Sequence, residues 1–576
     1  MTGARPIEPL RHRGRVPRDG DRDGGRRAER RAAVEAVLAE HGLLAAPSRR
    51  APGRLAGGGA APAPDLAPRL RRALSSLGPV FAAYGRYLSA RPDLLPPRDC
   101  LELAGVPDRA EPCGADELRA ALLRELGRPI EAVLRELEEE PEESRLLFQV
   151  HRARLVTGEA VTLRLRRPEL DGFLETDLDL LAAVDLPLSA EEGVPVPAEE
   201  VAGDFRRSLE RLIDLEREAE ALAALAGRTA DAGRAFGPFA AAGLLKVPAV
   251  HRRLSTPALL VHERLDGIPV EDLTAAGGPA LADAVAGRAL AARLALVWLQ
   301  LALEGEAFPA ETRGGFLRLL PDGRVALLGG GLVRLREAAR AHLRDYLFTA
   351  AGHEPAEALG ALLAEMTPGE HALGEERLRL RARQVVPFRD GAWSAGADEL
   401  AEHLFLQWRV ARECGYRPQA HLVAFYRGLA TTAQLCRAAA PEHDALRPAI
   451  EELRRRGGMD ELRGLVSPAG AAGWGAALEP HARLLLELPQ RLDELLSMLA
   501  RGETLIRLEV SDPPESDRRR GSLAALAALA LAILAVAVAA HRLADPALAG
   551  VWAERVGAVL LVGLGALLLR AVVRLG

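Results

Sequence analysis

The side chains that could carry chemistry in this chain are limited in type. The sequence has a single lysine, Lys246, and no asparagine. No phosphate loop of the Walker type can therefore form, because such a loop needs a Gly-Lys pair. Any mechanism that needs an ammonium group must use Lys246, and none can use an asparagine carboxamide.

Three other motifs have ambiguous chemistry. The acidic run 138–143 has the composition of a metal-binding patch or of a solvated loop, and a solvated loop is favoured. Gly329–Gly331 follows a predicted strand, but no lysine or GxGxxG pattern accompanies it, so a phosphate loop is not indicated. His151 is better explained as a strand histidine with local partners than as a ligand.

The cysteines form no CxxC pair and no zinc pattern. This is typical of a protein body that lies in the reducing cytosol.

Composition bounds the classes of function. The chain has 576 residues, 49% apolar and 27% charged, which allows a large core and several structural units. Its net charge of −5 argues against a nucleic-acid partner. No apolar segment follows Met1, so we expect no secretory signal peptide.

The elements that must position these residues change in kind along the chain. Apolar residues at helical spacing predict helices over 32–44, 70–88, 116–138 and 199–226, the third broken near 127–129. Alternation and turn signals predict strands over 146–155, 160–165, 249–254, 259–264, 316–320 and 325–328. The order of these elements predicts an α+β two-lobed fold. Helices come first, a small sheet with one long helix inserted follows, and a helical body comes last.

A C-terminal apolar segment predicts a transmembrane hairpin. Residues 523–540 are an unbroken run of Ala, Leu, Ile and Val, and such a helix of about 27 Å matches the bilayer core. A second run covers 556–573 if Arg570 reaches the interface. A buried hairpin and a dimerisation element are the alternatives. Arginines flank the outer ends of both spans, and positively charged residues favour the cytoplasmic side of a membrane. We therefore expect a multi-pass protein of the cell inner membrane, with its soluble body and both ends in the cytoplasm.

Residues 73–96 read ALSSLGPVFAAYGRYLSARPDLLP. They resemble the signature helix of the UbiB family of atypical kinase-like proteins, also called ADCK proteins. Further matching motifs follow in order at 149–153, 263–269, 320–324, 487–489 and 501–503. The resemblance implies a kinase-like two-lobed domain with a helical N-terminal extension, linked to ATP-dependent support of quinone biosynthesis and to lipid homeostasis.

This resemblance also sets the expected domain boundaries. The predicted segments are a disordered basic tail and linker (1–65), a helical extension with the degenerate KxGQ region (66–138), a kinase-like N-lobe (139–275), a kinase-like C-lobe (276–470), a helical connector (471–520) and the transmembrane hairpin (521–576).

The resemblance indicates which residues stand at the nucleotide positions. Arg164 replaces the strand lysine that holds the α- and β-phosphates, Glu218 is its expected partner, and Glu263 lies in the hinge strand. In the extension, Arg86 replaces a polar anchor of the KxGQ motif. Glu143 lies where close backbone approach to phosphate needs small side chains.

The catalytic and metal positions differ further from the family pattern. Glu311 replaces the catalytic-loop aspartate, Phe316 the metal-binding asparagine, and Gly329 the aspartate of the DFG-like motif. Mg²⁺ needs oxygen ligands, and two are missing together. We therefore expect no catalysis, no metal site and no cofactor. A cleft filled by Arg164, Phe316 and Arg86 would exclude a nucleotide in the family's pose.

The favoured function is a membrane-anchored pseudokinase, a scaffold or lipid-handling protein in quinone or lipid metabolism. Its expected partners are the lipid bilayer, a quinone or isoprenoid lipid, and a second copy or another membrane protein. The first alternative is an atypical kinase or ATPase of ubiquinone biosynthesis, using Arg164, Glu311, ATP and Mg²⁺ with unorthodox metal ligation. The second is an unrelated helical membrane protein with chance motifs.

Overall fold

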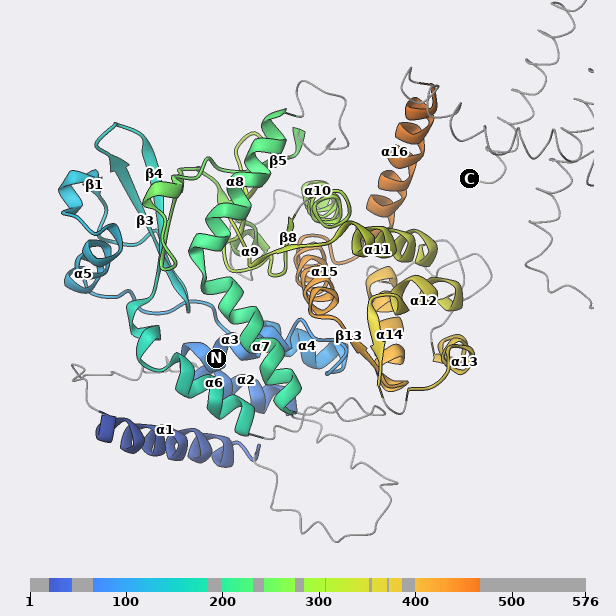
Figure 1. Cartoon of the computed structure of the whole chain (residues 1–576), viewed down its shortest axis with the longest axis horizontal. Helices are drawn as coiled ribbons and strands as arrows, with labels where there is room; N and C mark the ends of the chain where they lie inside the picture. Colours follow the sequence, from blue (N-terminus) through green and yellow to red (C-terminus); the bar gives the residue numbers. More distant parts are fainter. Residues whose placement is uncertain are drawn as a thin grey trace, which may run out of the picture. The chain divides into compact units, whose positions relative to one another are not determined.

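The chain divides into two units, Met1–Gly470 and Ala471–Gly576. The computed structural model describes residues 20–43, 66–184, 198–231, 243–274, 284–305, 307–351, 355–369, 372–385 and 399–466, which all belong to the first unit (Figure 1). The predicted connector and the apolar runs 523–540 and 556–573 lie outside the described residues.

The described unit combines helices with short strands, which confirms the mixed α+β content. The helices are α1 (Gly20–Glu40), α2 (Leu66–Ser76), α3 (Pro79–Leu88), α4 (Pro97–Ala104), α5 (Ala115–Leu126), α6 (Leu174–Ala183), α7 (Ala198–Ile213), α8 (Leu215–Asp231), α9 (Val270–Thr274), α10 (Ala284–Leu303), α11 (Glu337–Ala350), α12 (Pro355–Leu363), α13 (Glu375–Val385), α14 (Glu399–Glu413), α15 (Ala420–Ala439) and α16 (Leu446–Val466). The strands are β1 (Leu134–Leu137), β2 (Glu143–Ser144), β3 (Phe148–Leu155), β4 (Ala160–Arg166), β5 (Leu245–Lys246), β6 (Leu259–Glu263), β7 (Ile268–Pro269), β8 (Ala307–Pro309), β9 (Leu317–Leu319), β10 (Val325–Leu327), β11 (Leu332–Arg334), β12 (Met366–Pro368) and β13 (Tyr416–Pro418).

The N-terminal layer begins earlier and breaks more often than the sequence predicted. Helix α1 extends into the segment expected to be a disordered tail, because Val34 and Leu38 are buried in the main core. Arg30 also pairs with the buried Asp177, at 2.7 Å from Nε to Oδ1. The single helix predicted over 70–88 is wrong: Gly78 has φ 102° and is followed by Pro79, so α2 ends and α3 begins there.

A five-stranded antiparallel sheet forms the N-terminal half, with the order β1-β3-β4-β6 and β2 paired to β3. In β4, Val161 and Leu163 pack with Leu118 and Leu122 of α5 in a separate small core. Side chains alternate along a strand, so Arg164 points to the opposite face. This alternation directs Arg164 toward the helical half of the unit.

Three other predictions need correction. Beyond the break near 127–129, the helical pattern predicted over 116–138 is a short 3₁₀ helix, Ile130–Ala132, followed by strand β1, which pairs with β3. The helix predicted over 199–226 is two helices, α7 and α8, which meet at Asp214. The strand predicted over 249–254 is absent. That stretch contains a short 3₁₀ helix, Arg252–Leu254, and a single bridge between Val250 and His262.

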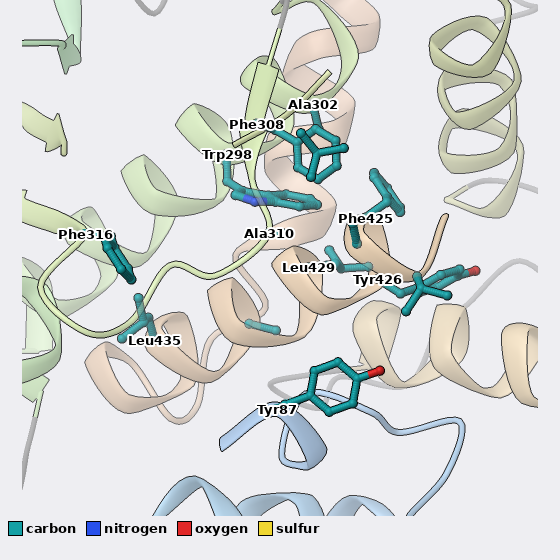
Figure 2. Packing of buried hydrophobic residues seen from close by; sticks show 14 of the residues in the cluster. Tyr87, Trp298, Ala302, Phe308, Ala310, Phe316, Phe425, Tyr426, Leu429 and Leu435 are labelled. Atoms are coloured by element: carbon teal, nitrogen blue, oxygen red, sulfur yellow. The ribbon is translucent and has the colours of Figure 1, made fainter. Parts of the chain in front are cut away.

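The helical half is organised around α10 and α15. Trp298 of α10, Phe308 of β8 and Phe425 of α15 form an aromatic cluster with ring-centroid separations of 5.4–6.2 Å (Figure 2). The indole Nε1 of Trp298 donates a hydrogen bond to the Pro309 carbonyl. Among the described residues, one helix segment, Val285–Leu303, is long and apolar enough to span a membrane, and 61% of it is buried. Its packing is that of a core helix.

Candidate functional site

The structure brings most of the predicted site residues together between the sheet and the helical half. Arg164 comes from β4, Glu218 from α8, Glu311 and Phe316 from the β8–β9 loop, and Gly329 from the β10–β11 loop. The two loops are joined by a hydrogen bond from the Glu311 backbone N–H to the Gly330 carbonyl, 3.0 Å.

Glu263 and the single lysine form a separate pair at the end of β6. The Lys246 ammonium lies 2.9 Å from Glu263 Oε2, and the Ala249 backbone N–H donates to the same carboxylate. Both charged side chains are partly exposed, at 28% and 37%. The polar partners of the Glu263 carboxylate in the described structure are therefore Lys246 and Ala249, and its nucleotide-binding role stays a prediction.

Arg164 is buried and held by aromatic rings and a carbonyl. Its Nη1 donates to the Leu328 carbonyl at 2.9 Å. Its guanidinium carbon lies 4.9 Å from the Phe316 ring centroid and 6.0 Å from that of Phe148. Burial lowers the pKa of Arg164 to about 10, although the Glu218 carboxylate acts to raise it. Arg164 is therefore still a cation at neutral pH, and its charge is directed into a hydrophobic cage.

Glu218 occupies the space that a side chain at position 329 would need. Its carboxylate accepts backbone N–H groups from Gly330, Gly331 and Leu332, at 2.6, 3.3 and 3.1 Å. A Cβ atom on Gly329 would overlap Glu218 Oε1 and lie 2.9 Å from Arg164 Nη1. Burial raises the pKa of Glu218, while Arg164 and the backbone donors act to lower it. The carboxylate thus binds the loop backbone instead of forming a direct ion pair with Arg164.

Glu311 is bound by its neighbour Arg313 through a two-pronged contact. Arg313 Nε and Nη2 each lie 2.8 Å from a Glu311 oxygen, and the Arg313 backbone N–H adds a third bond. Burial alone would raise the pKa of Glu311, but Arg313, with Arg86 and Arg427, lowers it to about 2. At neutral pH Glu311 is an ion-paired anion and a poor proton acceptor.

Arg313 also ties the loop to two distant helices. Its Nη1 donates to Ser89 Oγ and Gln434 Oε1, and its Nη2 donates to the Arg86 carbonyl. With the Glu311 bonds, each of its five guanidinium N–H groups has an acceptor. The sequence did not indicate Arg313 as a site residue, because Arg86, Ser89 and Gln434 are distant from it in the chain.

The rest of the cleft is filled by two more charged clusters. Arg86 Nη2 donates to Glu271 at 2.9 Å, and Glu271 accepts the Gly314 backbone N–H at 2.6 Å. Burial alone would lower the pKa of Arg86, but Asp108 and Glu271 raise it.

Glu143 forms the second cluster. It accepts a bond from Arg145 Nε at 2.6 Å and is also paired with Arg318. Sequence reasoning noted the charge of Glu143 and missed Arg318, Asp108 and Glu271, for which no local pattern exists.

Comparison with known proteins shows which proteins this chain is similar to. Residues 105–359 match the ABC1 atypical kinase-like domain. The chain is 36% identical over 207 residues to the probable protein kinase UbiB of Pseudomonas putida. Residues 105–359 therefore carry an ABC1 atypical kinase-like domain, and this part of the chain is similar to UbiB. The matched part covers 36% of this chain and 36% of that relative, so the similarity spans about a third of each.

A solved structure is also similar, the Rv3197–erythromycin complex from Mycobacterium tuberculosis. It is 18% identical, with a TM-score of 0.40, over 64% of this chain and 90% of that one.

Little open space is left in the cleft of this chain. A cavity of about 50 Å³ is lined by Arg86, Arg145, Phe148, Phe316 and Arg427, among others. Pockets that hold drug-sized ligands measure roughly 300–1,000 Å³. Among the described residues, no cluster of three His, Cys, Asp or Glu side chains is arranged to hold a metal ion.

Proposed function

We propose that this chain is a membrane-anchored pseudokinase of the UbiB family. It would support quinone or lipid metabolism as a non-catalytic scaffold or lipid-handling protein. The ABC1 atypical kinase-like domain provides the kinase-like frame. The membrane anchor and the loss of catalysis are our inferences.

The observation that carries the proposal is the position of the Glu218 carboxylate. It lies where the side chain of residue 329 would project, and it is bonded to three backbone N–H groups of that loop. A metal-binding aspartate at this position would collide with it. The arrangement supports a site in which the loop is held by protein contacts rather than through Mg²⁺.

Two further contacts support the same proposal. Phe316, at the position of the second metal ligand, packs its ring against the Arg164 guanidinium. Glu311 is bound on both oxygens by Arg313. The residues present therefore do not fit Mg·ATP in the family's pose, and we derive no catalytic step through it.

The anchoring part rests on the hydropathy of 523–540 and 556–573. Leu531→Arg with Leu534→Arg in the full chain should reduce carbonate-resistant membrane association, because each arginine costs about 2.5–3.5 kcal/mol at the centre of a span. The conservative pair Leu531→Ile with Leu534→Val is the matched control. Unchanged association of the arginine variant would contradict the anchor.

Nucleotide binding is tested on the full chain in detergent by thermal unfolding with ATP, with and without Mg²⁺. We expect no Mg²⁺-dependent rise in the melting temperature and no ATP turnover. A clear Mg²⁺-dependent rise, with turnover that Glu311→Ala abolishes, would instead establish the atypical kinase or ATPase. Glu117→Ala, on the exposed surface of α5, controls for the loss of one negative charge.

A further inference from the structure

A second basic cluster adjoins the cleft, in a small hollow between α7 and α15 that shares Tyr87, Ser208 and Arg427 with the lining of the cleft cavity. Each helix contributes one face with helical spacing i, i+3, i+4 and i+7. The hollow is lined by Asp204, Arg207, Ser208 and Arg211 of α7, by Ala420, Val423, Ala424 and Arg427 of α15, and by Tyr87 of α3. Small side chains on α15 leave room in front of the arginines of α7.

The charges in this hollow are poorly compensated. Three guanidinium groups line the hollow with one carboxylate, Asp204, which is already paired with Arg207 and lies 3.7 Å from Arg91. Arg427 also lies 3.9 Å from the buried Glu311 of the cleft, which leaves Arg211 as the arginine of the hollow without a carboxylate partner among the described residues. Among the described residues, Arg211 makes no hydrogen bond and no ion pair. Burial and the nearby charges of Arg217 and Arg207 lower the pKa of Arg211. A carboxylate that would offset these effects is missing from its surroundings in the described structure.

Arg427 provides a buried donor at the inner end of the hollow. It is 4% exposed, and its Nε has no hydrogen-bond partner in the described structure. Its guanidinium lies 4.7 Å from the Tyr87 ring centroid and donates from Nη1 to Ser208. Figure 2 shows Tyr87 facing the α15 helix from the N-terminal layer. A buried N–H without an acceptor is costly, which points to a missing partner.

The N-terminus of α15 adds a further positive end. Its N-cap residue, Gln419, makes no side-chain capping bond, and Ala420 of the first turn lines the hollow. The free N–H groups at the start of a long helix favour anions. The helix end and the arginines therefore act on the same space.

We infer that the α7–α15 hollow binds a phosphate monoester. With Glu311, which lies 3.9 Å from Arg427, three guanidinium groups and two carboxylates leave one net positive charge. That charge favours an anion such as a phosphate monoester, which carries about −1.5 to −2 at neutral pH. Guanidinium groups and a helix N-terminus are suited to several phosphate oxygens at once. The hollow measures about 10 Å³, which is less than a phosphate group occupies, so the phosphate would lie at its mouth. The site shares Arg427 with the cleft, but phosphate binding here does not require the loss of catalysis proposed for the cleft.

The test uses the full chain in detergent and two probes, inorganic phosphate and dioctanoyl phosphatidic acid, measured by calorimetric titration at constant ionic strength. Arg211→Gln should weaken binding of the probes about tenfold, because one charge-assisted contact is lost. Arg211→Lys should weaken it less, because the charge remains. Arg377→Gln, an exposed arginine on α13, changes the net charge equally and should have no effect.

The two probes distinguish the source of the phosphate. Tighter binding of phosphatidic acid, still dependent on Arg211, identifies a lipid headgroup, whereas equal affinities identify a soluble phosphate compound. Binding of neither probe, or equal loss in Arg211→Gln and Arg377→Gln, overturns the inference. The fold of the Arg211→Gln variant is checked by thermal unfolding in the absence of phosphate. Its melting temperature should not be lower than that of the parent chain.

Discussion

The cleft and the α7–α15 hollow both gather arginines, but they differ in how the charge is compensated. In the cleft, Arg313 has an acceptor for every guanidinium N–H, and Glu311 and Glu218 are each bound on both oxygens. In the hollow, Arg211 has no partner among the described residues, and Arg427 keeps an unbonded N–H. A fully paired network holds the fold together and has little capacity left for a ligand. An incompletely paired one retains that capacity.

The largest effect is expected from Arg313→Met. It leaves Glu311 buried without its main partner, and removing one member of a buried pair costs about 3–5 kcal/mol in unfolding free energy. Urea unfolding measures the change, with Arg377→Met as an exposed control. Adding Glu311→Gln should recover part of the loss. A cost of Arg313→Met below about 1 kcal/mol would show that the cleft is not held by this pair.

Gly329→Asp introduces the residue type that the resemblance predicts for this position and should nevertheless destabilise the chain. The new side chain overlaps Glu218, and φ at this position is 143°. Steric crowding and backbone strain together cost about 3 kcal/mol. Gly158→Asp, at φ 94° with nothing nearby, carries the strain alone. Mg²⁺-dependent nucleotide binding gained by Gly329→Asp would contradict the view that Glu218 closes this loop.

The pH dependence of the unfolding free energy should reveal how much the ionised Glu311 contributes to stability. Its folded pKa of about 2 lies below its ordinary value of 4.5. Its stabilisation is therefore present above about pH 4.5 and is lost as the pH falls toward about 2. The full effect is at most about 3 kcal/mol. Urea unfolding of the parent chain and of Glu311→Gln across this range should show the extra loss only in the parent. If the parent chain and Glu311→Gln lose the same unfolding free energy over this pH range, Glu311 is not a stabilising ion-paired carboxylate.

The smallest effect is expected at the partly exposed pair outside both clusters. Lys246→Met should cost less than about 1 kcal/mol, because the charges are solvated and screened. Added salt should reduce the difference further. A loss of several kcal/mol, insensitive to salt, would place Glu263 in a buried network that its exposure does not indicate.

Local patterns predicted the elements that are defined by local chemistry. The hairpins β3–β4 and β9–β10 were predicted correctly because turn residues and alternation specify them. The helix breaks at Gly78 and Asp214 were missed, since apolar spacing continues across both. The residues 249–254 were mistaken for a strand, although their backbone makes only one bridge.

Part of the candidate site was predicted from the family resemblance and not from local sequence patterns. The resemblance placed Arg164, Glu218, Glu311, Phe316 and Gly329 in one cleft, and the structure brings them together. It could not show that Glu218 would occupy the space beside Gly329, because that depends on side-chain packing. The contact of Arg313 with Gln434 joins residues 121 positions apart, a separation that no local pattern records.

The five bonds of Arg313 also have a consequence for motion. They fasten the end of α3, the β8–β9 loop and α15 to a single side chain. These segments cannot separate unless several charge-assisted bonds break together. Their amide protons should accordingly exchange with solvent only through large cooperative openings, so the N-terminal helical layer behaves as part of the same folding unit as the C-terminal helices.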